Sequence, residues 1–176
     1  LQEAMDNVII MSFAAGTMPQ FEHEMYSNNL PVDQYNKTWW AIAKRYQGIV
    51  PPNERGEEYC DAATKIHLTD FPAKYYDYAL SYIIVFQIND YISKHILHED
   101  PHNSNYYKRQ DVGTFFKKIL SPGATQDWRK LLKENTGEDL NARAMLEYYK
   151  PLLEYLKKEN QGRKRRTLFD RPCRRF

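Results

Sequence analysis

Four side chains between residues 65 and 78 have the types and spacing to hold the end of a peptide. Lys65 and His67 lie two positions apart on a short run predicted to be extended, and Tyr75 and Tyr78 lie three apart on one face of the helix predicted to follow. A lysine can pair with a carboxylate, while an imidazole and two phenols can hydrogen-bond a neighbouring carbonyl. The pattern therefore predicts a site that holds a substrate, with bond cleavage supplied by other groups. The ordinary alternatives are a surface lysine, a buried histidine and a tyrosine stripe in a helix core.

The string HEDPH at residues 98–102 matches the H-E-x-x-H pattern of zinc peptidases letter by letter. That chemistry requires a helix, which places the two imidazoles one turn apart and lets the glutamate act as a base. Pro101 lacks the backbone N–H and disfavours helix at the residue before it, so the segment is predicted to be a polar loop. We expect no zinc ligands in this chain, although His95 and the two histidines of the string could take up transition metals adventitiously.

Apolar residues recur at helical spacing along almost the whole chain, and strand signals are confined to Lys65–Leu68. Small residues around Ser12–Gly16 predict a break after the first helix. Asp70 is the expected N-cap of the main helix, and Pro151 is expected to break or kink the last one. The predicted helices are Leu1–Met11, Tyr35–Gln47, Pro72–His98, Asp111–Leu120, Thr125–Glu134, Asn141–Lys150 and Pro151–Asn160. The predicted fold class is all-α.

Length and composition allow one domain with a hydrophobic core, and they exclude a membrane-spanning segment and a disulfide-stabilised scaffold. The 176 residues contain no apolar run long enough to cross a membrane, and two cysteines, Cys60 and Cys173, cannot form a disulfide framework. The chain begins at Leu1 without a leader segment, so we expect an excerpt or a processed piece of a longer protein. It is predicted to consist of a helical region (1–162) and a basic tail (163–176). The tail holds seven of the 25 basic residues and one of the 23 acidic ones. Its charge would suit a polyanion at low salt, but a disordered end is the simpler interpretation, and no nucleic-acid partner is expected.

Several sequence blocks keep the order and spacing of one known family. They are Trp39-Trp40, residues 45–52 (RYQGIVPP), Tyr59-Cys60-Asp61, Lys65-Ile66-His67, Tyr75 to Tyr78, Phe86-Gln87, Gly113, Trp128, Leu131 and Leu146-x-Tyr148-Tyr149-x-Pro151-Leu152. Over roughly residues 1–162 the chain resembles the C-terminal part of angiotensin-converting enzyme and its relatives. The resemblance implies the all-α, C-terminal helical portion of a two-lobed ellipsoid with a deep central cleft. It also implies a zinc peptidyl-dipeptidase, an enzyme that removes dipeptides, or in one branch single residues, from the C-termini of peptides.

The resemblance assigns a role to each of the four side chains named first. Lys65 and Tyr75 match residues that bind the C-terminal carboxylate of the substrate. His67 matches a histidine that hydrogen-bonds near the scissile peptide, and Tyr78 matches a tyrosine that stabilises the tetrahedral intermediate. By resemblance, His67 and Tyr78 are therefore catalytic, and Lys65 and Tyr75 are substrate-binding.

Other positions depart from the pattern of the family. No segment of the chain matches the family's zinc helix, and the HEDPH string falls on the loop between two of the family's cysteines, which are replaced here by Ser93 and Ser104. Trp39 matches a residue beside a chloride site, but Ala43 and Asp77 stand where the family has chloride-binding arginines. Because a carboxylate repels an anion, we expect chloride binding to be absent.

These observations leave two functions open. The chain is either the substrate-holding segment of a zinc metallopeptidase or a catalytically inactive relative that binds peptides or acts as an interaction protein. The four retained side chains favour the first function, while the lost arginines and cysteines favour the second. The resemblance implies a peptide partner, zinc as the family's cofactor, and a secreted or membrane-anchored extracellular location, with any membrane contact made only through a parent chain. Asn36-Lys37-Thr38 is a glycosylation sequon, which matters if the chain is secreted.

Overall fold

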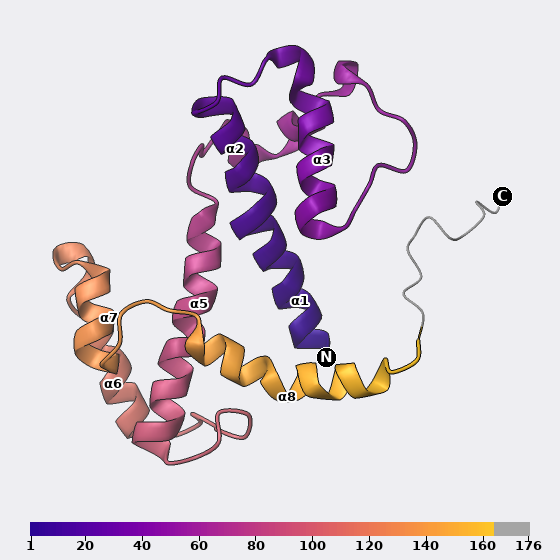
Figure 1. Cartoon of the computed structure of the whole chain (residues 1–176). Coiled ribbons are helices and arrows are strands. Elements are labelled where there is room, and N and C mark those ends of the chain that lie inside the picture. Colours follow the sequence, from indigo (N-terminus) through magenta and orange to yellow (C-terminus); the bar gives the residue numbers. More distant parts are fainter. Residues whose placement is uncertain (164–176) are drawn as a thin grey trace.

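A computed structural model describes residues 1–163 of the chain (Figure 1). Apart from Arg163, the basic tail and its predicted disorder lie outside the described residues. All regular structure within residues 1–163 is helical, with no strand, so the all-α prediction is confirmed.

The chain starts with a continuous helical rod. Its segments are α1 (Gln2–Met11), the π-helical turn η1 (Ser12–Thr17) and α2 (Met18–Tyr26). The break predicted near Ser12–Gly16 is therefore wrong. The small residues of this turn do not end the helix but let another helix approach closely, since a Cβ at Gly16 would lie 2.6 Å from the ring of Tyr46.

Helix α3 (Tyr35–Gln47) lies beside the upper part of this rod and has the predicted bounds (Figure 1). Gly48 ends it at φ 70°, a left-handed conformation that favours glycine. Short 3-10 turns flank the helix: η2 (Val32–Gln34), η3 (Glu57–Tyr59) and η4 (Asp61–Thr64). The first core lies between α2, α3 and the segments that follow α3, and it contains Met18, Phe21, Trp39, Ile42, Ala62 and Leu68.

The segment predicted to be extended is instead the short helix α4 (Ile66–Thr69). Only Lys65, directly before it, keeps an extended conformation, with φ −92° and ψ 101°. The helical turn brings Leu68 into the first core, where its side chain is buried. Burial of this one leucine therefore stabilises a conformation that the local sequence alone did not predict.

The main helix, α5 (Tyr76–Tyr91), begins later than predicted. Asp70 does not cap it, because a turn through Ala73, at φ 55°, separates the two. At its other end α5 continues without interruption into the π-helical turn η5 (Ile92–Leu97). His98, at φ 55°, ends this second rod, as the position of the following proline predicted.

Three further helices complete the described part of the chain. They are α6 (Gln110–Leu120), α7 (Trp128–Thr136) and α8 (Arg143–Glu159), with the turn η6 (Gly123–Thr125) between α6 and α7. Helix α8 runs through Pro151 as one helix, so the predicted break at this residue is wrong, while the alternative, a kink, stays a prediction. A proline removes only one backbone hydrogen bond, and the bonds on either side of it keep the helix continuous.

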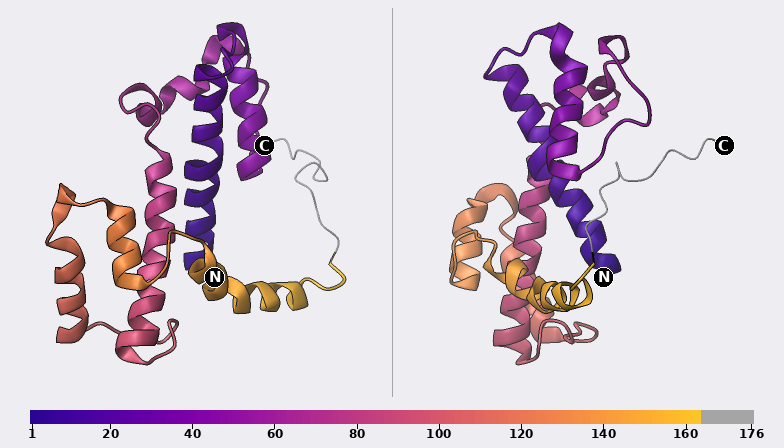
Figure 2. Two further views of the ribbon diagram at one scale, coloured as in Figure 1. Left: turned by 60° about the vertical axis from the view of Figure 1, so that its left-hand side comes forward. Right: turned by 45° about the vertical axis from the view of Figure 1, so that its right-hand side comes forward.

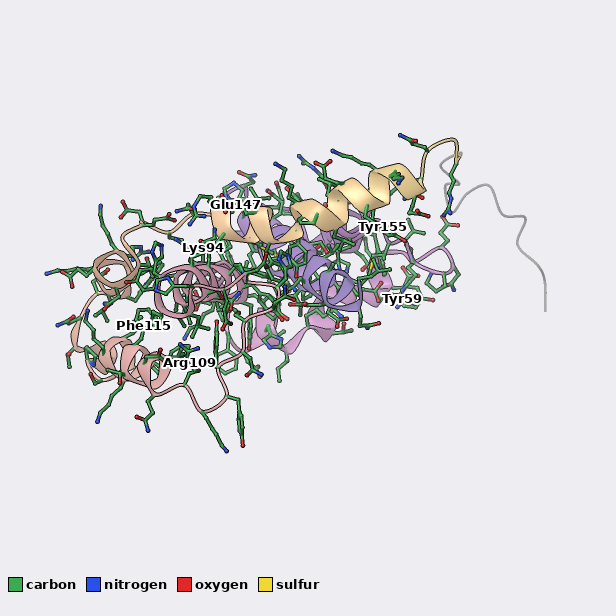
Figure 3. All side chains as sticks on the ribbon, turned by 90° about the horizontal axis from the view of Figure 1, so that it is seen from below. Tyr59, Lys94, Arg109, Phe115, Glu147 and Tyr155 are labelled. Atoms are coloured by element: carbon green, nitrogen blue, oxygen red, sulfur yellow. The ribbon has the colours of Figure 1, made fainter. Side chains whose placement is uncertain are left out.

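The second core lies at the far end of α5, where η5 packs against α6, and it contains Ile92, Leu97, Val112 and Phe115. Figure 2 shows α6 and α7 against this part of α5, with α8 crossing the foot of the first rod. Ion pairs tie α8 to the second rod. Lys94 lies 3.2 Å from Glu147 (Figure 3), and Arg143 lies 3.0 Å from Asp90. Within residues 1–163, no helix combines the length and the apolar composition that crossing a bilayer requires.

Candidate functional site

Three aromatic side chains converge where α4 meets the start of α5. The His67 ring lies 4.6 Å from the Tyr75 ring and 6.3 Å from the Tyr78 ring, with interplanar angles of 79° and 84°. The two tyrosine rings are 5.0 Å apart. The structure therefore brings together three of the four side chains that the sequence singled out, on residues from two separate elements.

A buried carboxylate holds the turn between these two elements. The backbone N–H of Ala73 donates to Oε1 of Glu22 at 2.5 Å, and the Glu22 side chain is buried on α2. Ala73 has φ 55°, a conformation that an alanine adopts only at some cost in free energy. The hydrogen bond to Glu22 offsets this cost and fixes the approach of α5 to α4. No pattern around Glu22 in the sequence indicates that it positions the site.

Lys65 lies at the edge of this cluster. Its Nζ is 5.9 Å from the centre of the Phe13 ring, and that ring packs edge-on against Tyr75 at 5.2 Å. An ammonium near an aromatic face is weakly attracted to it. Lys65 is exposed, so its flexible side chain can reach a ligand held beside Tyr75.

The cluster borders a hollow of about 390 Å³, which falls in the size range of small-ligand sites. The hollow is lined by His67, Phe71, Lys74, Tyr75, Asp77 and Tyr78. Lys65 is not part of this lining, whereas a second lysine, Lys74, is. The sequence did not single out Lys74, because no local pattern shows which side of a turn faces a hollow.

The two tyrosines differ in their surroundings. Tyr78 is 50% exposed and can meet a ligand directly, while Tyr75 is half-buried between Phe13 and His67. Burial, and next the neighbouring Tyr78, raise the pKa of the Tyr75 phenol above its usual value. Both effects keep this phenol protonated, so it remains a hydrogen-bond donor over the whole physiological pH range.

The HEDPH string forms a loop, as predicted, and its histidines do not share a helical face. His98 has left-handed backbone geometry, while the ring of His102 lies within 2.8 Å of Oδ1 of Asp100 and 2.8 Å of the backbone oxygen of Tyr148. Both partners are acceptors, so both ring nitrogens donate only in the protonated imidazolium. The hydrogen bond to Tyr148, and then the one to Asp100, raise the pKa of His102.

The zinc that the resemblance implies does not fit the described residues. Within residues 1–163, no three side chains of His, Cys, Asp or Glu lie together so as to hold a metal ion. Both ring nitrogens of His102 already have partners: Asp100 within the loop, and the backbone oxygen of Tyr148, which fastens the loop to α8. We therefore derive no chemical step that runs through a metal.

The residues at the family's chloride positions lie in different surroundings. Trp39 is buried and packs edge-on against Phe13 and Phe21, and Ala43 is buried in α3. Asp77 is exposed and brings a carboxylate to the hollow. The absence of chloride binding stays a prediction, and the acidic lining at Asp77 is the physical reason for it.

Ser93 and Ser104, the positions at which the family has cysteines, lie side by side. Oγ of Ser93 donates to Oγ of Ser104 at 2.8 Å, and Ser93 is fully buried. A hydrogen bond between the two hydroxyl groups thus joins η5 to the loop that carries the HEDPH string.

Asn36, the residue of the glycosylation sequon, is fully buried in α3. Its Nδ2 donates to the backbone oxygen of Gly56 at 2.8 Å, and its Oδ1 accepts from the backbone N–H of Asp61 at 2.8 Å. A glycan attached to Nδ2 would have to displace the segment that these bonds hold. The folded structure therefore argues against Asn36 as a glycan acceptor.

Comparison with known proteins agrees with these features. Residues 1–167 match the family model described as angiotensin-converting enzyme, Peptidase_M2. The chain is similar to angiotensin-converting enzyme of Mesocricetus auratus, with 32% identity over 163 residues, and to that of Mus musculus, with 31% identity over 163 residues. Each match includes 92% of this chain and 12% of the relative. It is 29% identical to angiotensin-converting enzyme of the species Theromyzon tessulatum, with 90% of this chain and 26% of that protein covered. The chain spans about an eighth of the length of the first two relatives, and it belongs to the angiotensin-converting enzyme family.

Proposed function

We propose that this chain is the substrate-holding segment of a peptidase that trims peptides from the C-terminus. The observation that carries the proposal is the convergence of His67, Tyr75 and Tyr78 on a hollow that also contains a lysine. These groups suit a ligand that presents a carboxylate next to a peptide carbonyl. Membership of the angiotensin-converting enzyme family supports the same substrate class.

Each residue has a defined part in the proposed function. Lys65 and the Tyr75 phenol bind the substrate carboxylate, and His67 donates a hydrogen bond near the scissile peptide. The exposed hydroxyl of Tyr78 donates to the oxygen that becomes negative in the tetrahedral intermediate. Removal of one such donor costs about 3 kcal/mol of transition-state stabilisation in comparable enzymes.

Bond cleavage in the family depends on zinc, and no group of three potential metal ligands lies together among residues 1–163. The chain on its own is therefore expected to bind a peptide without cleaving it. The alternative function, an inactive relative that binds peptides, predicts the same binding by these 176 residues. In a secreted or membrane-anchored parent protein, the substrate would be an extracellular peptide.

Binding of a short peptide tests the proposal directly. An N-acetylated tetrapeptide with a free carboxylate is titrated against the same peptide with a C-terminal amide, and affinity is followed by NMR of the backbone amides. The free carboxylate should bind about tenfold more tightly, because a hydrogen-bonded charge is worth more than a neutral group. Equal affinities for the two peptides would refute the proposal.

Matched variants locate the binding. Tyr75→Phe and Tyr78→Phe should each weaken binding of the free carboxylate peptide by several-fold, since each removes one donor. Tyr76→Phe is the control, because Tyr76 is also exposed on α5 but does not line the hollow. Lys65→Met should weaken binding more than Lys118→Met, a change on the exposed surface of α6.

A further inference from the structure

We propose that Lys74 and Asp77 determine specificity at this site and select peptides with a basic side chain at the C-terminal residue. The inference rests on the proposed function and adds a substrate class to it. Both residues line the hollow, and they carry opposite charges. Neither is one of the four residues to which the resemblance assigned a role.

Both charges are available to a ligand. Within residues 1–163, neither side chain forms an ion pair or a side-chain hydrogen bond, with the other or with any third residue; other acids of the chain, such as Asp61 and Asp90, are paired with arginines. Lys74 and Asp77 are both exposed. A ligand that enters the hollow thus meets one unpaired cation and one unpaired carboxylate, with no internal pair to break first.

The two charges are expected to bind different parts of the peptide. Asp77 lies in the first turn of α5, one residue before Tyr78, while Lys74 lies directly before Tyr75. We therefore expect Lys74 to pair with the peptide carboxylate that the Tyr75 phenol binds. A basic side chain that extends along the hollow from the same residue meets Asp77, and the aromatic face of Phe71 can cover its aliphatic stem.

The same arrangement rejects other C-terminal residues. An acidic side chain in the hollow would be repelled by Asp77 and would compete with the peptide carboxylate for Lys74. An apolar side chain could pack on Phe71 but would leave Asp77 without a partner. The expected order of affinity is therefore arginine, then leucine, then glutamate as the last residue of the peptide.

Three N-acetylated tetrapeptides that differ only in their last residue, Arg, Leu or Glu, test this order by NMR titration. The Arg peptide should bind about three- to fivefold more tightly than the Leu peptide at low ionic strength, a typical ratio for an exposed ion pair. In Asp77→Asn this ratio should fall to about one, because the Arg side chain no longer meets a carboxylate. Asp70→Asn removes a carboxylate from the same segment but not from the lining, and should preserve most of the preference.

Substitution of Lys74 should affect the peptides differently from substitution of Asp77. Lys74→Met should weaken the Arg and Leu peptides by the same factor and leave their ratio unchanged, because both carry the same carboxylate. A preference for Arg that survives in Asp77→Asn, or an equal affinity of the unaltered chain for the Arg and Leu peptides, would refute the inference. If these peptides still bind more tightly than their amides, the proposed function stands while the specificity does not. If no carboxylate dependence is found, both fail.

Discussion

Gly16→Ala should destabilise the chain, although alanine is the better helix former. The position lies inside the continuous rod, where a Cβ would be 2.6 Å from Cγ and Cδ1 of Tyr46 and 2.8 Å from its Cβ. Ordinary contacts of a Cβ lie at about 3.4–4 Å, and Cβ of Tyr46 moves only with the α3 backbone. Relief of the overlap therefore requires α3 to shift away from the rod. Overpacking of this kind costs about 1–3 kcal/mol, and the higher helix propensity of alanine returns about 0.5–1 kcal/mol.

Gly113→Ala is the matched control. Gly113 lies inside α6, has no positive φ, and has open space within 4 Å of the position that a Cβ would take. The same substitution should therefore stabilise the chain there, by about 0.5–1 kcal/mol. Urea unfolding followed by circular dichroism gives both changes as shifts of the midpoint at constant slope.

A double-mutant cycle identifies the cause of the loss. In a Tyr46→Ala background most of the overlapping ring is gone, so Gly16→Ala should cost clearly less than it does alone. NMR shifts of Tyr75 should also change in Gly16→Ala, because Phe13 on the same turn packs against that ring. If Gly16→Ala is as stable as Gly113→Ala, the close packing of the rod against α3 is refuted.

Three further changes test other parts of the structure. In a background whose two native cysteines are serines, Ser93→Cys with Ser104→Cys should form a disulfide under mild oxidation and stabilise the chain by about 3 kcal/mol, as expected for a loop of about a dozen residues; failure to oxidise would show that the two hydroxyls are not adjacent. Pro151→Ala should raise the free energy of unfolding by about 1–3 kcal/mol, measured as a higher urea midpoint, and should increase helicity, whereas a loss of stability would contradict a continuous α8. The pKa of His102 is raised in the folded chain, so its stabilisation is complete below the unfolded value of about 6.5 and is lost as the pH rises through the folded pKa. His102→Gln should abolish this decline in thermal midpoint and His98→Gln should not; equal slopes for the two would exclude the bonds to His102 as the cause.

Helices were predicted well where the spacing of apolar residues and the residues that end a helix indicate the same bounds. The range Tyr35–Gln47 matches α3 at both ends, because the apolar face and Gly48 are both local signals. The region around Ser12–Gly16 was predicted wrongly for the opposite reason. Its small residues are explained by Tyr46, which lies thirty positions further along the chain and is brought close only by folding.

The site divides in the same way. The spacing of Tyr75 and Tyr78 is local and was predicted, although Tyr75 is the N-cap residue of α5 and not part of the helix. Their contact with His67 depends on the short helix α4, which was not predicted. The positions of Lys74 and Asp77 in the lining depend on a turn that a distant carboxylate, Glu22, holds by a single hydrogen bond. No pattern within the segment itself contains that information.

The distinction between holding a peptide and cleaving it decides which experiment bears on function. Hydrolysis needs an activated water as well as donors to the developing oxyanion. The roles that we propose for His67 and Tyr78 concern the donors only. A measurement of peptide cleavage therefore tests both requirements together and does not isolate the proposed donors. Binding of a carboxylate, by contrast, is proposed to depend on Lys65, Lys74 and Tyr75. Lys74 and Tyr75 line the hollow, and Lys65 lies 5.9 Å from the Phe13 ring that packs against Tyr75. A difference in affinity between the free-carboxylate peptide and its amide thus tests the proposed binding residues directly. The result has the same meaning whether bound peptides are cleaved or only held.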